Sequence, residues 1–162
     1  MLELKLEGLE DVTARLEAYP TALSAELDAE ATKLAGALLD LVKDDKLSGA
    51  VLNIGSGALR DSIVASISSD SAGIVASVGS TGDVKYAAIQ EYGGKTSAHE
   101  ILPVKAQALA FVAGGAQRFA LRVDHPGSLI PERSYLRSSL DDMEGQILDA
   151  LADAVADAWE GA

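Results

Sequence analysis

Apolar and charged residues alternate at the start of the chain, and a helical repeat then takes over. Residues 1–7 alternate leucine with glutamate or lysine, a period of two that predicts a half-buried strand. Apolar residues at helical spacing predict a short helix over residues 9–19. Pro20 predicts a break, because proline lacks the N–H that a helix interior needs, and it can begin a second helix as the first residue. From Thr21 apolar residues step by three or four, which predicts a long amphipathic helix ending near residues 46–49.

The middle of the chain predicts two β-hairpins. Residues 59–69 and 74–80 each place apolar side chains on one face, and the segment between them has turn composition. Residues 101–112 and 117–123 flank the sequence Ala-Gly-Gly-Ala, and this arrangement favours a second hairpin.

Two connections, a short helix and a final helix complete the pattern. The connection over residues 47–57 is rich in glycine and serine, and we expect its apolar residues to tuck against the body or a neighbouring molecule: Val51, Leu52 and Ile54. A short helix is expected near residues 86–92, closed by a Gly-Gly pair and followed by a polar, mobile segment over residues 95–100. After Pro131 a helix is predicted nearly to the end, with one apolar stripe and one stripe of aspartates: Asp142, Asp149, Asp153 and Asp157.

These elements together predict the α+β class and a single domain over residues 1–162. The long N-terminal amphipathic helix and the C-terminal helix should pack on a mainly antiparallel sheet of four to five strands. A chain of 162 residues leaves little room for a second domain.

Composition then narrows the classes of function. The net charge of −12 argues against a protein whose main task is to grip nucleic acid, because that grip comes from lysine and arginine neutralising phosphates. An acidic wall can, however, let nucleic acid pass without adhering. The chain has no cysteine, which excludes disulfides and thiolate chemistry and suits a reducing cytosol. It also lacks an apolar signal-peptide core and any run near the roughly 18 apolar residues of a membrane span, so we expect no membrane partner.

The candidate chemistry centres on the stretch Asp-His-Pro-Gly-Ser at residues 124–128. Pro126 holds the backbone of His125 in an extended shape, and side chains of neighbouring residues in extended backbone point apart, so Asp124 is badly placed to orient His125. Ser128 lacks the setting of a nucleophile elbow. The sequence has no metal-binding spacing of histidines or carboxylates. We therefore expect no enzyme activity and no cofactor or metal, and a small hydrolase using His125 is the least favoured reading.

Four motifs in a fixed order resemble those of tailed-bacteriophage neck and tail-completion proteins, a family variously described as virion morphogenesis, minor tail protein Z-like or head–tail joining proteins. The first, Ser-Gly-Ala-Leu-Arg-Asp-Ser-Ile, lies at residues 56–63 and has serine where the family usually has threonine. Val-Gly-Ser follows at 78–80, Tyr-Ala-Ala-Ile-Gln-Glu-Tyr-Gly-Gly at 86–94 and Pro-Glu-Arg-Ser-Tyr-Leu at 131–136. The resemblance extends over most of the chain.

The resemblance implies a structural virion subunit at the junction of head and tail. Such a subunit forms a ring, for which we expect six copies, that completes or terminates the tail and joins it to the head. It would reside in the virion, pass through the host cytoplasm during assembly, and contact other tail and neck proteins. DNA would pass through an acidic lumen, lined by the aspartate stripe or by another acidic face, without being bound specifically.

A ring needs one patch that binds a different patch on an identical copy. The candidate interface residues lie in the glycine-rich connection, the first motif and the stretch that enters the last helix: Val51, Leu52, Ile54, Arg60, His125, Pro126, Gly127, Arg133 and Tyr135. Tyr135 and Leu136 are expected to anchor that stretch to the core, and Arg133 to form an ion pair. The alternative function is an assembly factor outside the virion, or a head-side adaptor or stopper that binds other neck proteins.

Overall fold

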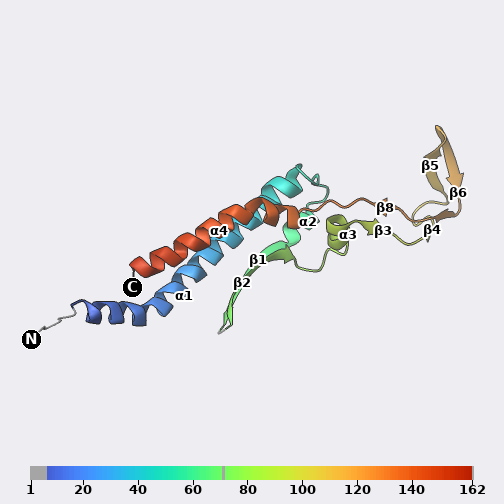
Figure 1. Ribbon diagram of the computed structural model, residues 1–162. Coiled ribbons are helices and arrows are strands. Elements are labelled where there is room, and N and C mark those ends of the chain that lie inside the picture. Colours follow the sequence, from blue (N-terminus) through green and yellow to red (C-terminus); the bar gives the residue numbers. More distant parts are fainter. Residues whose placement is uncertain (1–6, 71, 162) are drawn as a thin grey trace, which may run out of the picture. The chain divides into compact units, whose positions relative to one another are not determined.

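The computed structural model describes residues 7–70 and 72–161 (Figure 1). Its internal contacts divide the chain into two compact units. Unit 1 comprises Met1–Ala87 with Ser134–Ala162, and unit 2 comprises Ala88–Arg133. The single domain inferred from the sequence stays a prediction, and the strand expected over residues 1–7 falls almost wholly on residues 1–6, outside the described residues.

Unit 1 is built on one long helix, where the sequence predicted two. Helix α1 runs over Leu9–Asp40 with Pro20 inside it, continues as a π-helical turn over Leu41–Asp45 and closes with a 3₁₀ turn over Lys46–Ser48. The predicted break at Pro20 is therefore wrong. A proline inside a helix removes one backbone hydrogen bond and bends the axis, and Figure 1 shows α1 bending in its N-terminal part.

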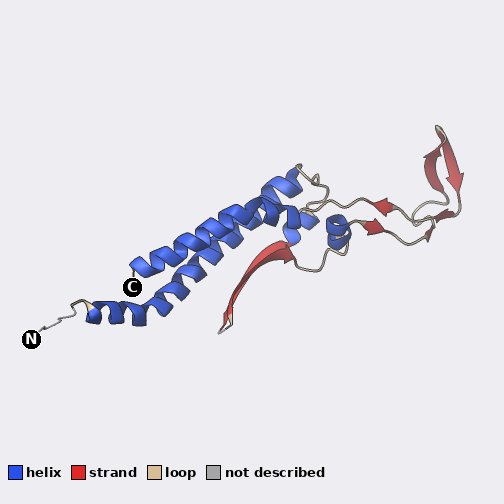
Figure 2. Ribbon diagram, in the orientation of Figure 1, coloured by secondary structure: helices blue, strands red, loops and turns tan. Residues whose placement is uncertain are grey.

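The C-terminal end of the last helix contacts the first turns of α1. Helix α4 spans Arg137–Glu160 and packs along α1 (Figure 2). Near its end, Trp159 meets the ring of Tyr19 edge-on at 5.5 Å between centroids, and the Arg15 guanidinium lies 4.9 Å from the centre of the indole. The Arg15 side chain also donates a hydrogen bond to the Trp159 carbonyl. Both α1 residues in these contacts, Arg15 and Tyr19, precede Pro20. Contacts with α4 therefore offset the free energy that the proline costs the helix.

The first predicted hairpin is present, shortened by one helical turn. The predicted first strand starts instead as a short helix, α2 over Ala58–Ser62, before β1 over Ile63–Asp70 pairs antiparallel with β2 over Gly73–Ser80. The Asp70 carboxylate accepts hydrogen bonds from the backbone N–H groups of Ala72 and Gly73 and so shapes the turn. Both strands pack on α1.

The core of unit 1 is small and lies where α1 ends. Partly buried leucines and valines surround a cluster of four buried side chains: Val42, Leu47, Ile63 and Tyr135. Burial of each of the three aliphatic residues stabilises the fold by about 1.5–3 kcal/mol. The Tyr135 hydroxyl donates to the Ala87 carbonyl at 3.4 Å. Residues 131–136 lie outside the helix, so α4 begins later than the sequence predicts.

Unit 2 is a two-stranded arm made of three successive antiparallel ladders around one turn. Helix α3 spans Ala87–Tyr92. Its first residue belongs to unit 1 and the remaining residues belong to unit 2. The arm consists of β3 with β8 (Gly94–Lys95, Leu129–Ile130), β4 with β7 (His99–Ile101, Val123–His125) and β5 with β6 (Leu109–Ala113, Ala116–Ala120). At its tip Gly114 and Gly115 have φ of 62° and 77°, the left-handed backbone of a two-residue hairpin turn.

Two sequence expectations for the arm need correction. The segment over residues 95–100, expected to be mobile, supplies strand residues to two ladders. The strand expected over residues 101–112 is interrupted by residues 102–108, where Pro103 cannot donate to a ladder. The α+β class is confirmed, with a long N-terminal helix, a C-terminal helix and antiparallel strands. Within the described residues these strands form four two-stranded ladders rather than one sheet of four to five strands.

Candidate interaction surfaces

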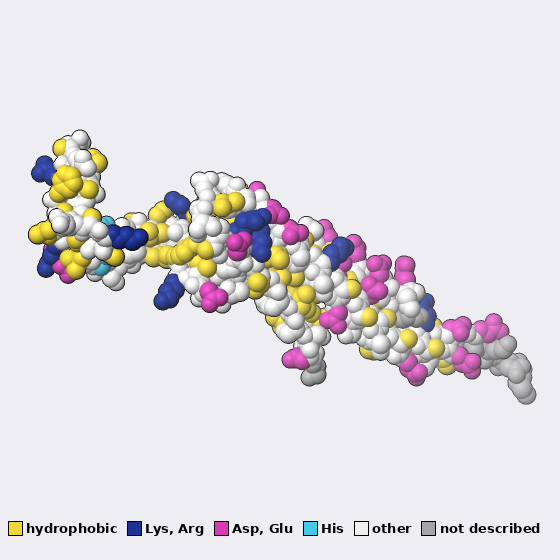
Figure 3. Space-filling view, turned by 180° about the vertical axis from the view of Figure 1, so that it is seen from behind, with side chains coloured by type: hydrophobic (Ala, Val, Ile, Leu, Met, Phe, Trp, Pro, Cys, Tyr) yellow, Lys and Arg dark blue, Asp and Glu magenta, His cyan; other side chains and the backbone are white. Residues whose placement is uncertain are grey.

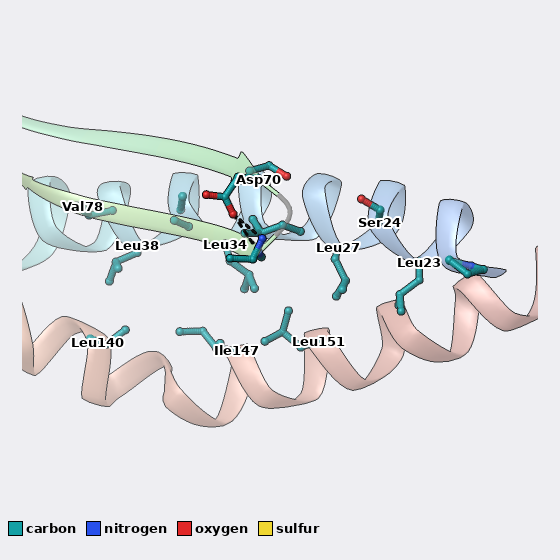
Figure 4. A pocket seen from close by; sticks show the side chains of 18 residues that line it. Leu23, Ser24, Leu27, Leu34, Leu38, Asp70, Val78, Leu140, Ile147 and Leu151 are labelled. Carbon is teal, nitrogen blue, oxygen red and sulfur yellow. Dashed lines mark hydrogen bonds between the residues drawn. The ribbon is translucent and has the colours of Figure 1, made fainter. Parts of the chain in front are cut away.

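An apolar groove of about 720 Å³ lies in unit 1 between α1, α4 and the β1–β2 hairpin. Figure 4 shows leucines of α1, among them Leu23 and Leu27, pointing toward Ile147 and Leu151 of α4 across this space. Most of the other described residues that line it are apolar as well, and among them Asp70 alone is charged. The groove therefore presents an apolar lining contributed by two helices and a hairpin of the same unit. A pocket of this volume can accommodate several side chains.

The tip of the arm in unit 2 also exposes apolar side chains. In the β5–β6 ladder, Ala110 lies opposite Phe119 and Val112 opposite Gln117, so these four share one face. That face carries no charge, and Val112 and Phe119 are 75% and 69% exposed. We define these four residues as the arm face.

The opposite side of the arm tip differs in chemistry. Phe111 lies opposite Arg118, and Phe111 is only 39% exposed. An isolated two-stranded hairpin is marginally stable in water, so an uncharged, uncovered face on such an arm is typical of a surface that a partner covers.

The first three candidate interface residues, in the glycine-rich connection, have different surroundings. Val51 and Leu52 pack against the core of unit 1, while Ile54 is 56% exposed. The predicted tucking against the body is thus confirmed for two of the three.

Arg60, the next candidate interface residue, contacts other residues of unit 1. Its Nε donates to the Lys43 carbonyl at 3.1 Å, and its guanidinium forms an ion pair with Asp44. This pair joins α2 to the end of the α1 segment and gives Arg60 a structural role within one chain.

The stretch around His125 is part of the arm. His125 pairs with His99 across the β4–β7 ladder, and the two imidazoles stack with centroids 5.1 Å apart. Nδ1 of His125 accepts a hydrogen bond from the backbone N–H of Gly127 at 3.0 Å. Asp124 instead meets Arg122, whose guanidinium also contacts Glu100 at 2.8 Å. Asp124 is therefore engaged by an arginine and does not orient His125 as a catalytic base.

Pro126 and Gly127 explain why the ladder is interrupted there. Pro126 is exposed and has no N–H to donate, so pairing stops after β7 and resumes at β8. Gly127 has φ of 87°, and a Cβ on it would lie 2.1 Å from the Thr96 carbonyl oxygen. The two strands remain tied by the Thr96 N–H donating to the Ser128 carbonyl at 2.9 Å. This stretch is therefore one strand of the arm, interrupted at Pro126 and Gly127.

The last two interface candidates have different surroundings. Tyr135 is buried in the core of unit 1, which confirms the expected anchoring, and Leu136 packs against the same core. Arg133 is exposed, and its backbone N–H donates to the Gln90 carbonyl at 2.9 Å.

The aspartate stripe lies on the side of α4 opposite the groove. Asp149, Asp153 and Asp157 are exposed and follow one another at four-residue spacing, which places them on one helix face. Asp142 shares that side and forms an ion pair with Lys46. Figure 3 shows acidic side chains distributed along the helices of unit 1.

Charge is distributed unevenly between the units. Unit 2 has five of the thirteen lysines and arginines but only four of the twenty-five acidic residues, so it carries a net charge of +1. Unit 1 carries the remainder, eight basic and twenty-one acidic residues, a net charge of −13. The arm side chains visible in Figure 3 are mainly apolar, with several lysines and arginines and the histidine pair.

No cluster for metal chemistry was found in the part of the chain that the structure describes: there is no group of three or more His, Asp or Glu side chains placed to hold an ion. Among the helices described, none is long and apolar enough to cross a membrane.

Sequence reasoning missed the arm face. The signal was present in the run Leu-Ala-Phe-Val-Ala at residues 109–113, which is apolar without alternation. Such a run indicates a strand with two apolar faces, and both faces then need cover.

A scan against protein-family models found no match, and searches of curated proteins and of solved structures found none either.

Proposed function

We propose that this chain is a structural virion protein of a tailed phage, placed at the head–tail junction. Copies of it form a ring of six that completes or terminates the tail and joins it to the head, in contact with other tail and neck proteins. The chain performs no catalysis and uses no cofactor. DNA passes through the ring without specific binding.

The observation that carries this proposal is where the motif residues lie. In the first motif Ser62 and Ile63 are buried, and the Ser62 hydroxyl lies 2.9 Å from that of Ser80 in the second motif. In the third motif, a Cβ on Gly93 would lie 2.7 Å from the backbone nitrogen of Glu132 in the fourth. The last motif supplies Tyr135 to the core. The residues that carry the resemblance thus lie at close contacts within each unit, which fits a subunit whose role is to build an assembly.

The uncovered apolar surface supports the same proposal. A subunit that functions only within an assembly can leave groove and arm open until a neighbour covers them, because the assembled state supplies the missing burial. A monomeric enzyme of this mass has no such requirement.

The aspartate stripe gives the proposed ring its inner wall. Carboxylates at Asp149, Asp153 and Asp157 repel a phosphate backbone and so let DNA leave quickly. A structure of the assembled ring tests this assignment. Aspartates on the outer rim of the ring would remove it, while the structural role of the chain would stand.

Mass spectrometry of tailed particles purified from the organism that encodes this chain tests the proposal itself. We expect the chain in the particle, in a number of copies that fits one ring. Its absence from particles that nevertheless need its gene for assembly would favour the alternative, an assembly factor outside the virion. Location of its density on the head side of the neck would favour an adaptor or stopper.

A further inference from the structure

We propose that the arm face of one copy inserts into the apolar groove of the next copy, and that this contact links the subunits. The inference rests on the proposed function in that a ring needs such a contact, and it adds which two surfaces meet. The contact is heterologous, because the two patches differ, so repeating it produces a closed ring if the rotation closes.

The arm face and the groove match in chemistry. The groove is lined almost entirely by apolar residues, with Asp70 as the only charge among the described residues that line it. The arm face offers Ala110, Val112 and Phe119 with Gln117 and carries no charge. Insertion therefore buries no unpaired charge of the arm face, and Arg118, on the opposite side of the ladder, can stay in water.

Unit 2 of one copy and unit 1 of another carry net charges of opposite sign. The arm belongs to a unit with net charge +1, and the groove to a unit with net charge −13. Two copies of unit 1 repel each other, whereas unit 2 of one copy can approach unit 1 of another without that repulsion. This asymmetry favours contact between unlike units over a symmetric contact of groove with groove.

The arm face also has apolar surface that its own unit leaves uncovered. Val112 and Phe119 are 75% and 69% exposed, so a second copy can bury both of them. Other proteins of the neck could cover either surface, and the test is designed so that only a second copy gives the expected signal.

The absence of cysteine makes a clean cross-linking test possible. One variant carries Gln117→Cys on the arm face, and the other carries Ser24→Cys, an exposed position in the groove lining. Neither substitution removes an apolar side chain. The two full-length variants are mixed at high concentration and treated with a short bis-maleimide, which captures transient contact. Because each chain has one thiol, a product that joins the two variants can only come from contact between copies.

A matched control replaces Ser24→Cys by Asp149→Cys, which is exposed and lies outside the groove. We expect at least five-fold more cross-linked heterodimer with the groove thiol than with this control. Adding Phe119→Ser should reduce the product to the control level, whereas Phe111→Ser, on the opposite face of the arm, should leave it nearly unchanged.

Equal yields with the groove and control thiols would overturn the inference, and so would equal effects of the two phenylalanine substitutions. A chain with both thiols that cross-links only within itself would also overturn it, because the arm would then cover its own groove. These results are independent of the particle analysis. The chain can be present in virions and fail this test, or pass it and be absent from virions.

Discussion

Replacing Gly127 by alanine should loosen the arm where its two strands approach most closely. An L-residue at the φ of 87° found there costs about 1–2 kcal/mol. The added Cβ would also lie 2.1 Å from the Thr96 carbonyl oxygen, so the strands must separate by about 1 Å or more. That separation breaks the bond from the Thr96 N–H to the Ser128 carbonyl and the bond from the Ser128 N–H to Thr96 Oγ1. At about 1 kcal/mol for each bond, the total is about 3–4 kcal/mol.

Gly115→Ala provides the matched control. Its φ of 77° imposes the same backbone cost, but a Cβ there meets nothing within 4 Å. The difference between the two variants, about 2 kcal/mol, therefore isolates the steric clash. Hydrogen exchange at the Thr96 and Ser128 amides of the full chain is the assay. Protection at these amides should fall about 30-fold further in Gly127→Ala than in Gly115→Ala. Equal protection in the two variants would show that the strands do not approach as described.

Three further substitutions test unit 1. Ile63→Ala removes a fully buried side chain and should lower the free energy of unfolding by about 2–5 kcal/mol. Ile54→Ala, at an exposed position, should change it by less than about 0.5 kcal/mol, and urea midpoints compare the two. Arg15→Met removes the cation over Trp159 and should cost about 0.5–1 kcal/mol. Fluorescence of Trp159, the only tryptophan, reports this change, and an unaltered spectrum and midpoint would contradict the contact.

The helices of unit 1 could largely be predicted from the sequence, because apolar periodicity reports a face that is buried within the same chain. Leu34 and Leu38 belong to that periodic stripe, and they do face α4. Pro20 could not be judged from local rules. Its cost is offset by Trp159, which is distant in sequence and contacts residues on the N-terminal side of the proline.

The strands were predictable as local pairs but not as a sheet. Glycine at residues 114 and 115 predicts the tip turn, and alternation predicts the pairing of β1 with β2. A pattern of apolar residues does not say which molecule will cover them, however, and Val112 and Phe119 have no cover within the described chain. The apolar pattern therefore led to the expectation of one sheet, whereas the described strands form separate two-stranded ladders.

The proposed contact should be weak for a single pair of subunits and strong in a closed ring. Full burial of Val112 and Phe119 contributes about 3–6 kcal/mol, which only matches the lower part of the cost of associating two molecules, about 4–15 kcal/mol. One arm in one groove would therefore hold two copies together poorly. In the proposed ring the closing contact forms within one assembly, at high effective concentration, and the proposed binding to a tail end would have the same effect. Light scattering across concentrations should thus detect monomer and complete ring with little of the sizes between them, and Phe119→Ser should abolish the ring. A population dominated by stable dimers would contradict this energetic reasoning.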